Sequence, residues 1–491
     1  MADSESKATL GGKGWRPLDT LSIGGWIILF IAVASTIAVT VWPEKEIEGV
    51  QVWVFARNHA ELYDVLAQEY NADADAGDTS RLNITTIDND ALTRRVLSGF
   101  WSNTPLADLI EIERDKMTQF VTGPLEHVGF TDLTDRIMAE GLDKKINYPS
   151  FGPWTSRGRI FGLPHDVHPV LLCYRADLVE QAGIDVSEIE TWDDFARVMK
   201  PLISDLDGDG RPDRYLLNLW YSQMGELEVL LLQAGGGTFD ENDNSLVASD
   251  ANVMVVAQSV AWMVGPERIA IDAPEFDASG NQLKLDGRVV AVVMPDWLAG
   301  VWKSDLSQLG GKLKLMPLPA WEPGGRRTSV RGGTMIGIPK ATEDFETAWQ
   351  IAKYLYISPE LSERLFEASN IISPVTEFWD EDYYKQPDPF FSGQASGTAF
   401  IEQAPNVPFR SSNPFHVMAR NRIADAVTDL YAEASGGNVV GPDGKKIPAD
   451  EVTSDLLEDR ARELLQAAEA RLLKEMSRNV FLKRDREAED E

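Results

Sequence analysis

Residues 165–168, His-Asp-Val-His, bring two imidazoles and one carboxylate within four positions. Such side chains can ligate zinc or transfer protons. In an extended chain, however, His165 and His168 point to opposite faces, which is a poor arrangement for a single metal ion. No third ligand at a matching spacing accompanies them. We therefore expect Asp166 and His168 to line a binding cleft rather than a catalytic zinc centre.

A second group of oxygen ligands lies in the stretch SDLDGDGRPDRY, residues 204–215. Four carboxylates match positions 1, 3, 5 and 9 of a calcium-binding loop; they are Asp205, Asp207, Asp209 and Asp213. Position 12 is Leu216 instead of the bidentate glutamate. The pattern permits a structural Ca²⁺ ion, and an Asp/Gly-rich turn without metal is the alternative.

The composition limits the classes of function. The chain has 491 residues and a net charge of −32, so it repels phosphate backbones and nucleic acid is not an expected partner. Cys173 is the single cysteine, which excludes an intramolecular disulfide and a thiolate zinc site. Apart from the Ca²⁺ ion, we expect no cofactor.

The elements that must position these residues alternate between strand and helix. β-Branched and apolar runs at residues 49–55, 81–88 and 104–113 predict three strands with amphipathic helices between them. This order predicts a parallel sheet, and ligands bind at the carboxyl ends of such strands. Polar side chains follow those ends, and we expect them around one crevice: Asn58, His59 and Glu113, with Arg114 beside them.

A second α/β alternation begins after Asp177, and 491 residues are too many for one ordinary domain. Aromatic side chains at the predicted strand ends could contact the CH-rich face of a sugar, or they could be core residues; they are Trp220, Tyr221, Trp297 and Trp321. The stretch SDLLEDRARELLQAAEARLLKEM, residues 454–476, predicts a long amphipathic helix near the C-terminus.

Residues 21–42 form an uncharged apolar stretch, long enough to cross a bilayer as a helix. Basic residues precede it and acidic residues follow it, which predicts a cytoplasmic tail at 1–20 and a linker at 43–48. The chain is then a single-pass protein of the cell membrane, with its large part on the periplasmic or extracellular side. A cleaved signal peptide is the alternative.

Several motifs in order resemble one family. FGLPHDVHPVLLCYRADLVEQAGID (161–185) and TWDDFARVMKPL (191–202) resemble the pattern G-L-P-x-D, Y-N-x-D-L-F-x-x-A-G and T-W-D-E-F. KLKLMPLPAW (312–321), GGTMIGIPKA (332–341) and a later A-W-x-x-x-K-Y-L helix resemble its second block. The family is the sugar-binding class of bacterial extracellular solute-binding proteins, receptors of ABC importers that include maltose-binding protein. The similarity spans roughly residues 49 to 475.

The resemblance implies an α/β, two-lobed periplasmic-binding-protein fold of type II, here with an N-terminal transmembrane helix and a helical C-terminal segment. We expect residues 49–168 with 291–328 in lobe 1, residues 169–290 with 329–478 in lobe 2, and a charged tail at 479–491. A sugar or oligosaccharide would be clamped by lobe closure and delivered to ABC permease subunits. Gly333 and Thr334 would offer backbone N–H groups to it.

Two departures bear on the ligand: Arg175 stands where Asn is usual, and Thr334 where an aromatic residue often stands. Arginines at 57, 326, 327 and 331 could favour an anionic sugar, although solvated surface arginines are the preferred interpretation. Two other functions remain open. One is a hydrolase using Glu113 and Asp166 as its carboxylate pair. The other is a sensor that docks on a membrane receptor instead of a permease.

Overall fold

The computed structural model describes residues 22–41, 49–72, 81–102, 104–220, 223–441 and 444–479. They belong to two units that divide between Glu48 and Gly49. Helix α1 (Ile23–Val41) is the described element of the first unit. Among the described residues, no helix has both the length and the apolarity required to cross a membrane. The predicted tail 1–20, the linker 43–48 and residues 480–491 of the charged tail lie outside the described residues.

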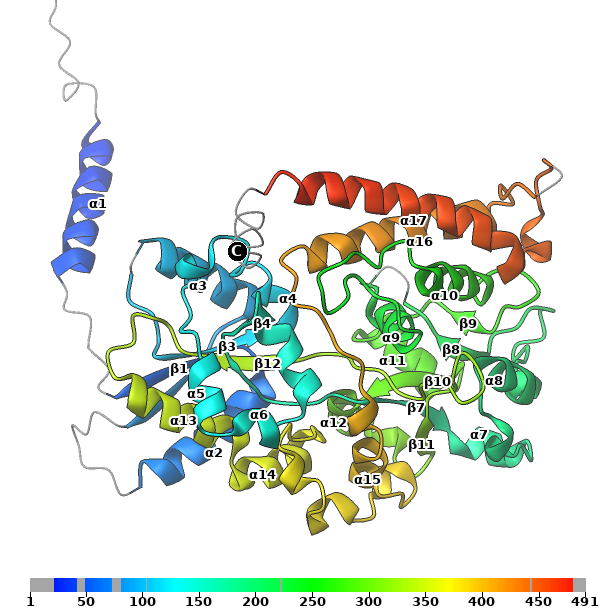
Figure 1. Ribbon diagram of the computed structural model, residues 1–491, viewed down its shortest axis with the longest axis horizontal. Helices are drawn as coiled ribbons and strands as arrows, with labels where there is room; N and C mark the ends of the chain where they lie inside the picture. Colours follow the sequence, from blue (N-terminus) through cyan, green and yellow to red (C-terminus); the bar gives the residue numbers. More distant parts are fainter. Residues whose placement is uncertain are drawn as a thin grey trace, which may run out of the picture. The chain divides into compact units, whose positions relative to one another are not determined.

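The first lobe is built on a five-stranded sheet with the order β2-β1-β3-β12-β6. β1 pairs in parallel with β2 and β3, as predicted, whereas β12 is antiparallel to both of its neighbours. In Figure 1, β12 lies beside the early strand β3 although it comes from the middle of the chain. The strands are β1 (Val50–Val54), β2 (Leu82–Thr86), β3 (Leu109–Glu113), β6 (Leu163–Pro164) and β12 (Thr334–Gly337).

Helices cover both faces of this first sheet. Alternation along each strand sends apolar side chains to both faces, so two core clusters form. The helices α2 (Arg57–Tyr70), α13 (Phe345–Ile357) and α14 (Pro359–Ser369) cover one face. The helices α3 (Asn89–Ser102) and α4 (Arg114–Met117) cover the other. Smaller elements complete the lobe: α5 (Thr134–Ala139), α6 (Leu142–Lys145), β4 (Thr155–Ser156) and β5 (Arg159–Ile160).

The second lobe is built on another five-stranded sheet, with the order β11-β7-β10-β8-β9. β7 is antiparallel to β10 and to β11, and β10 is parallel to β8. Every residue of β7 and β10 is buried, as expected for central strands covered on both faces. The strands are β7 (Val170–Arg175), β8 (Tyr215–Asn218), β9 (Ala270–Ile271), β10 (Val289–Pro295) and β11 (Leu313–Pro317).

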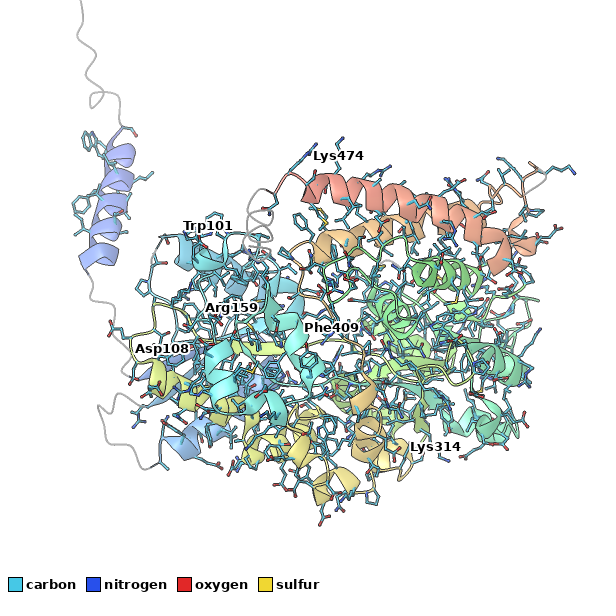
Figure 2. All side chains as sticks on the ribbon, in the orientation of Figure 1. Trp101, Asp108, Arg159, Lys314, Phe409 and Lys474 are labelled. Atoms are coloured by element: carbon cyan, nitrogen blue, oxygen red, sulfur yellow. The ribbon has the colours of Figure 1, made fainter. Side chains whose placement is uncertain are left out.

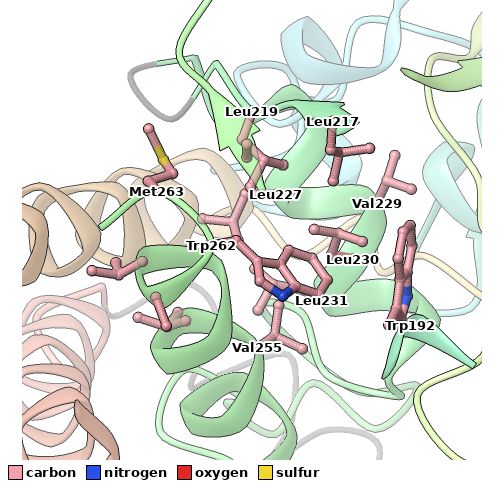
Figure 3. Packing of buried hydrophobic residues seen from close by; sticks show 14 of the residues in the cluster. Trp192, Leu217, Leu219, Leu227, Val229, Leu230, Leu231, Val255, Trp262 and Met263 are labelled. Carbon is pink, nitrogen blue, oxygen red and sulfur yellow. The ribbon is translucent and has the colours of Figure 1, made fainter. Parts of the chain in front are cut away.

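The helices of the second lobe pack on two further core clusters. Figure 3 shows part of the larger one, where Trp192 and Trp262 pack among the leucines of α9. That face carries α7 (Ala176–Gln181), α8 (Trp192–Met199), α9 (Gly225–Gln233), α10 (Asp250–Ala261), α16 (His416–Ser435) and α17 (Ser454–Met476). The opposite face carries α11 (Ala278–Leu285), α12 (Asp296–Asp305) and α15 (Ser396–Ile401).

Two local features of this lobe follow from short sequence patterns. Thr191 caps α8: its side chain accepts from the Asp194 N–H, and the Asp194 carboxylate accepts from the Thr191 N–H. This is the reciprocal capping box that the Thr-x-x-Asp spacing predicts. The C-terminal helix α17 has the predicted bounds, 454–476, and lies along α16 in Figure 1.

Within the described residues, three segments of the chain cross between the lobes. Residues 165–169 join β6 to β7, and residues 331–333 join the Pro169–Val330 bridge to β12. The third crossing lies near Ile371 and Ile372, whose side chains belong to the cores of different lobes. The predicted boundary between residues 168 and 169 therefore falls inside the first crossing.

The other predicted lobe boundaries differ from the structure. Residues 291–328 were expected in lobe 1, but β10 and β11 belong to the second sheet. Residues 329–478 were expected in lobe 2, but β12, α13 and α14 belong to the first lobe. The physical reason is that the apolar run of β10 shows only that helices cover both of its faces, and it does not identify the sheet to which the strand belongs.

Candidate functional site

The first crossing carries a buried ion triad centred on His168. Its Nε2 lies 3.0 Å from Asp166 Oδ2, and its Nδ1 lies 2.6 Å from Asp296 Oδ1. The three side chains are at most 4% exposed. Although burial opposes the charge, the two carboxylates raise the pKa of His168 to about 10. His168 is therefore an imidazolium at neutral pH, held between two carboxylates of the protein.

Asp166 has a structural role in the same triad. Its Oδ2 also accepts a hydrogen bond from the Thr334 N–H at 3.1 Å, which ties the first crossing to the second. Burial alone would raise the pKa of Asp166, but His168 and His165 hold it well below its usual range. Because its carboxylate is bonded within the protein, Asp166 is not a free general acid, and the hydrolase interpretation loses one of its two carboxylates.

His59 is buried in the first lobe. Its Nδ1 lies 3.1 Å from Glu111 Oε2, which also accepts a hydrogen bond from Tyr356 at 2.9 Å. The His165 ring lies 4.5 Å from the His59 ring, centroid to centroid. His59 therefore packs inside the first lobe and bonds β3 through Glu111, whereas the neighbouring Asn58 is exposed in the first turn of α2. The sequence feature that indicates this buried cluster is Glu111, a glutamate within the otherwise apolar run of β3.

Glu113 lies at the carboxyl end of β3, opposite Thr334 of β12. Its carboxylate accepts a hydrogen bond from Asn89, and burial, followed by the charge of Asp115, raises its pKa. Of the two backbone N–H groups expected to bind ligand, that of Thr334 already donates to Asp166, while at Gly333 the carbonyl accepts from the Arg114 N–H. The Glu113 side chain, in contrast, lies at the predicted strand end and is half-buried, so part of it is exposed.

The predicted aromatic residues occupy different environments. Trp297 donates through Nε1 to the Arg331 carbonyl, and its ring stacks with the exposed Phe276 at 6.1 Å. Trp321 instead stacks with Trp262 at 5.6 Å and packs, partly buried, against the core of the second lobe. Trp220 lines an apolar pocket beneath α9 and α10, together with Leu227 and Met263. Tyr221 lies outside the described residues.

Charged side chains join the two lobes across the gap between their strand ends. Arg114, from the first lobe, donates to Glu228 of α9 at 2.8 Å and reaches His416 Nε2 at 2.9 Å. Arg420 of α16 donates to Asp115 of the first lobe at 2.6 Å. Burial, and next the charge of Arg114, lower the pKa of His416 to about 3, so this imidazole is neutral and its Nε2 accepts from Arg114.

These side chains line a small pocket with an accessible volume of about 10 Å³. Its wall combines Arg114 of the first lobe with residues of the second, among them Glu228, Phe239, Arg410 and His416. Phe409, labelled in Figure 2, approaches Gly152 of the first lobe next to this pocket. The strand-end argument placed Arg114 near the crevice. It missed Glu228, Arg410, His416 and Arg420, which come from distant helices and loops and share no spacing motif.

The predicted calcium loop is partly assembled. Within the described residues, Asp205, Asp207 and Asp209 form the one acidic or imidazole group compact enough for a metal ion, with ligand atoms within 4.8 Å of one another. Asp213 instead forms an ion pair with Arg288 at 2.8 Å. Three of the four predicted ligands therefore come together, all of them exposed, and Ca²⁺ binding stays a prediction.

Comparison with known proteins gives one consistent result. A model of the family described as bacterial extracellular solute-binding protein matches residues 59–357. The arabinooligosaccharide-binding protein of Halalkalibacterium halodurans is 24% identical, over 69% of this chain and 74% of that protein. The lactose-binding protein of Rhizobium radiobacter has the same identity and coverage. The solved structure of the sugar-binding protein MalE from Xanthomonas citri covers 87% of this chain and 98% of its own, with a TM-score of 0.66 at 17% identity.

Proposed function

Since this chain belongs to the family of bacterial extracellular solute-binding proteins, we propose that it captures a carbohydrate between its lobes and delivers it to an ABC importer. It is a binding protein and not an enzyme. The hydrolase interpretation of Glu113 and Asp166 is therefore abandoned. The capture step is a hinge motion about the three crossings, with the ligand stabilising the closed arrangement.

The observation that carries the proposal is the pocket walled by both lobes. Arg114 enters it from the end of β3, while Glu228, Thr238 and His416 enter it from the second lobe. A ligand that bonds both walls is held best when the lobes are closed, which couples binding to closure. Guanidinium, carboxylate and hydroxyl groups suit the many hydroxyls of a sugar, because each hydroxyl both donates and accepts.

Carbohydrate is the ligand class best supported for this pocket. The relatives named above are an arabinooligosaccharide-binding and a lactose-binding protein. The stacked pair Trp297 and Phe276 adds aromatic surface beside the second crossing, where a sugar ring could pack its CH face. We propose Glu113 and Trp297 as ligand contacts from the sequence-predicted set, because the structure leaves both partly exposed.

The proposed location is the outer face of the cell membrane, with the apolar stretch 21–42 as a single anchor. The support is the uncharged sequence itself and the helix that α1 forms within it, whose large apolar side chains are exposed over Ile23–Ile37. Permease subunits of the importer are the proposed partners. A structural Ca²⁺ at Asp205, Asp207 and Asp209 is proposed as the one bound ion.

The test is isothermal calorimetry with arabino-, xylo-, malto- and galacto-oligosaccharides, followed by analysis of the recovered sugar. We expect one series to bind and to be recovered unchanged. A ligand at 100 times its dissociation constant should also stabilise the protein by about 2.7 kcal/mol, which a thermal shift detects. Cleavage of the sugar, or no binding by any carbohydrate, would refute the proposed function.

A further inference from the structure

Arg410 is a buried cation whose charge no carboxylate of the described chain neutralises by contact. Its side chain is 4% exposed and lines the pocket between the lobes. One nitrogen, Nη1, donates to the Gly332 carbonyl. Among the described residues, no acidic oxygen lies within 4 Å of its guanidinium, in contrast to Arg114 and Arg420. A guanidinium carries five N–H donors, so most of its bonding capacity is unused.

This arrangement is costly without a ligand. A buried charge without a partner of opposite charge destabilises a protein by several kcal/mol. Burial, and next the charge of Arg114, lower the pKa of Arg410 to about 9, which reflects the same cost. At neutral pH the guanidinium is still protonated. A group of opposite charge in the pocket would remove most of the penalty.

The charges around the pocket show which sign is missing. Of the described side chains that line the pocket, Arg114, Arg410 and Arg420 are cations and Glu228 is the one carboxylate. The charge of Asp166 also acts on Arg410, but that carboxylate is bonded to His168. His416 is neutral because its pKa is lowered to about 3. Glu228 pairs with Arg114 and Asp115 pairs with Arg420, so Arg410 is the cation of this described lining that has no ion pair, within a chain whose net charge is −32.

We propose that the pocket between the lobes selects an acidic carbohydrate, a uronate, whose carboxylate is bound by Arg410. The inference rests on the proposed function and specifies its substrate class. A carboxylate carries one negative charge, which matches the single guanidinium without an ion pair, whereas a phosphate monoester carries more. A guanidinium can also bond both oxygens of a carboxylate at once.

The position of Arg410 links this recognition to closure. Gly332, whose carbonyl it holds, and Gly333 form the second crossing, with φ angles of 100° and 134° that only glycine adopts readily. The Arg114 N–H bonds the Gly333 carbonyl at 3.0 Å. Both arginines therefore contact the hinge segment as well as the pocket, so a carboxylate on Arg410 is bound where the lobes pivot.

The experiment compares uronate disaccharides of the galacto, gluco and manno series with their neutral counterparts, by calorimetry on the full chain. We expect at least one uronate to bind at least tenfold more tightly than its neutral counterpart, and salt to weaken that advantage. Arg410→Gln should remove most of the preference. Arg327→Gln is the matched control, because the Arg327 side chain donates to the Leu318 and Ile189 carbonyls and lies outside the pocket; its preference should equal that of the wild type.

Thermal unfolding separates recognition from structural support. Arg410→Gln should melt no lower than the wild type, because it removes an unpaired buried charge. A large fall in melting temperature, with equal losses for uronates and neutral sugars, would make Arg410 a support of the Gly332 carbonyl and overturn the inference. Binding of neutral sugars alone, or tighter binding of sugar phosphates, would also overturn it while leaving the proposed function intact. No binding by any carbohydrate refutes both.

Discussion

Replacing His168 by asparagine should destabilise the folded protein by about 3–5 kcal/mol, because two carboxylates are then buried without their cation. His168 lies 3.0 Å from Asp166 and 2.6 Å from Asp296. Asparagine tolerates the positive φ of this position, 57°, so backbone strain adds little to the change. The substitution removes the charge while leaving a side chain that can still donate to one carboxylate.

The pKa of His168 gives a second estimate of the loss in free energy of unfolding. It rises from 6.5 to about 10 on folding, and each tenfold change in proton affinity is worth about 1.4 kcal/mol, which gives on the order of 5 kcal/mol. Because the folded pKa is the higher one, this stabilisation is complete below pH 6.5, declines as the pH rises towards 10, and is lost above it. The gap between wild type and variant should therefore be largest near pH 6.

The assay is urea unfolding followed by tryptophan fluorescence, at pH 6.0 and at about pH 9.5. The matched control is His127→Asn, because His127 is exposed on the surface of the first lobe. This control should change the free energy of unfolding by less than about 0.5 kcal/mol. A His168→Asn effect below about 1 kcal/mol at pH 6, or an equal effect at both pH values, would refute the buried imidazolium.

Three further outcomes follow from the described contacts. Glu228→Gln removes the closer carboxylate of the buried Arg114 guanidinium, at 2.8 Å, and leaves Asp115 at 3.8 Å; it should cost about 3 kcal/mol in the same unfolding assay, and an effect within experimental error would contradict the inter-lobe pair. Trp321→Ala should cost about 3–5 kcal/mol through lost packing, with little change in sugar affinity, whereas Trp297→Ala should weaken sugar binding by about 1 kcal/mol; calorimetry that shows the reverse would exchange their roles. The Cys173 thiol, whose pKa burial raises, should react with a thiol reagent at pH 8 only after denaturation, and labelling of the native protein would show that β7 opens.

Local patterns predicted the elements well. The runs at 49–55, 81–88 and 104–113 contain β1, β2 and β3, and the amphipathic stretch 454–476 is α17. Each pattern depends on neighbours a few residues apart, so the sequence displays it directly. Local patterns could not predict which lobe each strand joins. A buried central strand such as β10 has the same apolar composition in either sheet, and only its pairing partners decide where it lies.

In the candidate site, too, local sequence patterns predicted some residues and not others. The rule that ligands bind at strand ends brought Glu113 and Arg114 to the correct edge of the first sheet. It did not identify Glu228 or Arg410, because each lies more than one hundred positions later and reaches the pocket through tertiary packing. His59 follows a strand as predicted, yet its ring turns inward, because Glu111 on β3 offers a buried carboxylate at 3.1 Å.

The place of β12 in the first sheet has a consequence during synthesis. Thr334 pairs with Glu113, more than two hundred residues earlier in the chain. At a ribosomal rate of about 5–20 residues per second, β3 emerges roughly 10 to 40 seconds before the strand that completes its edge. Until then its backbone N–H and carbonyl groups are open to pairing with other chains. The first lobe therefore cannot close before β12 has been made, and a holding chaperone would protect the nascent chain over that interval.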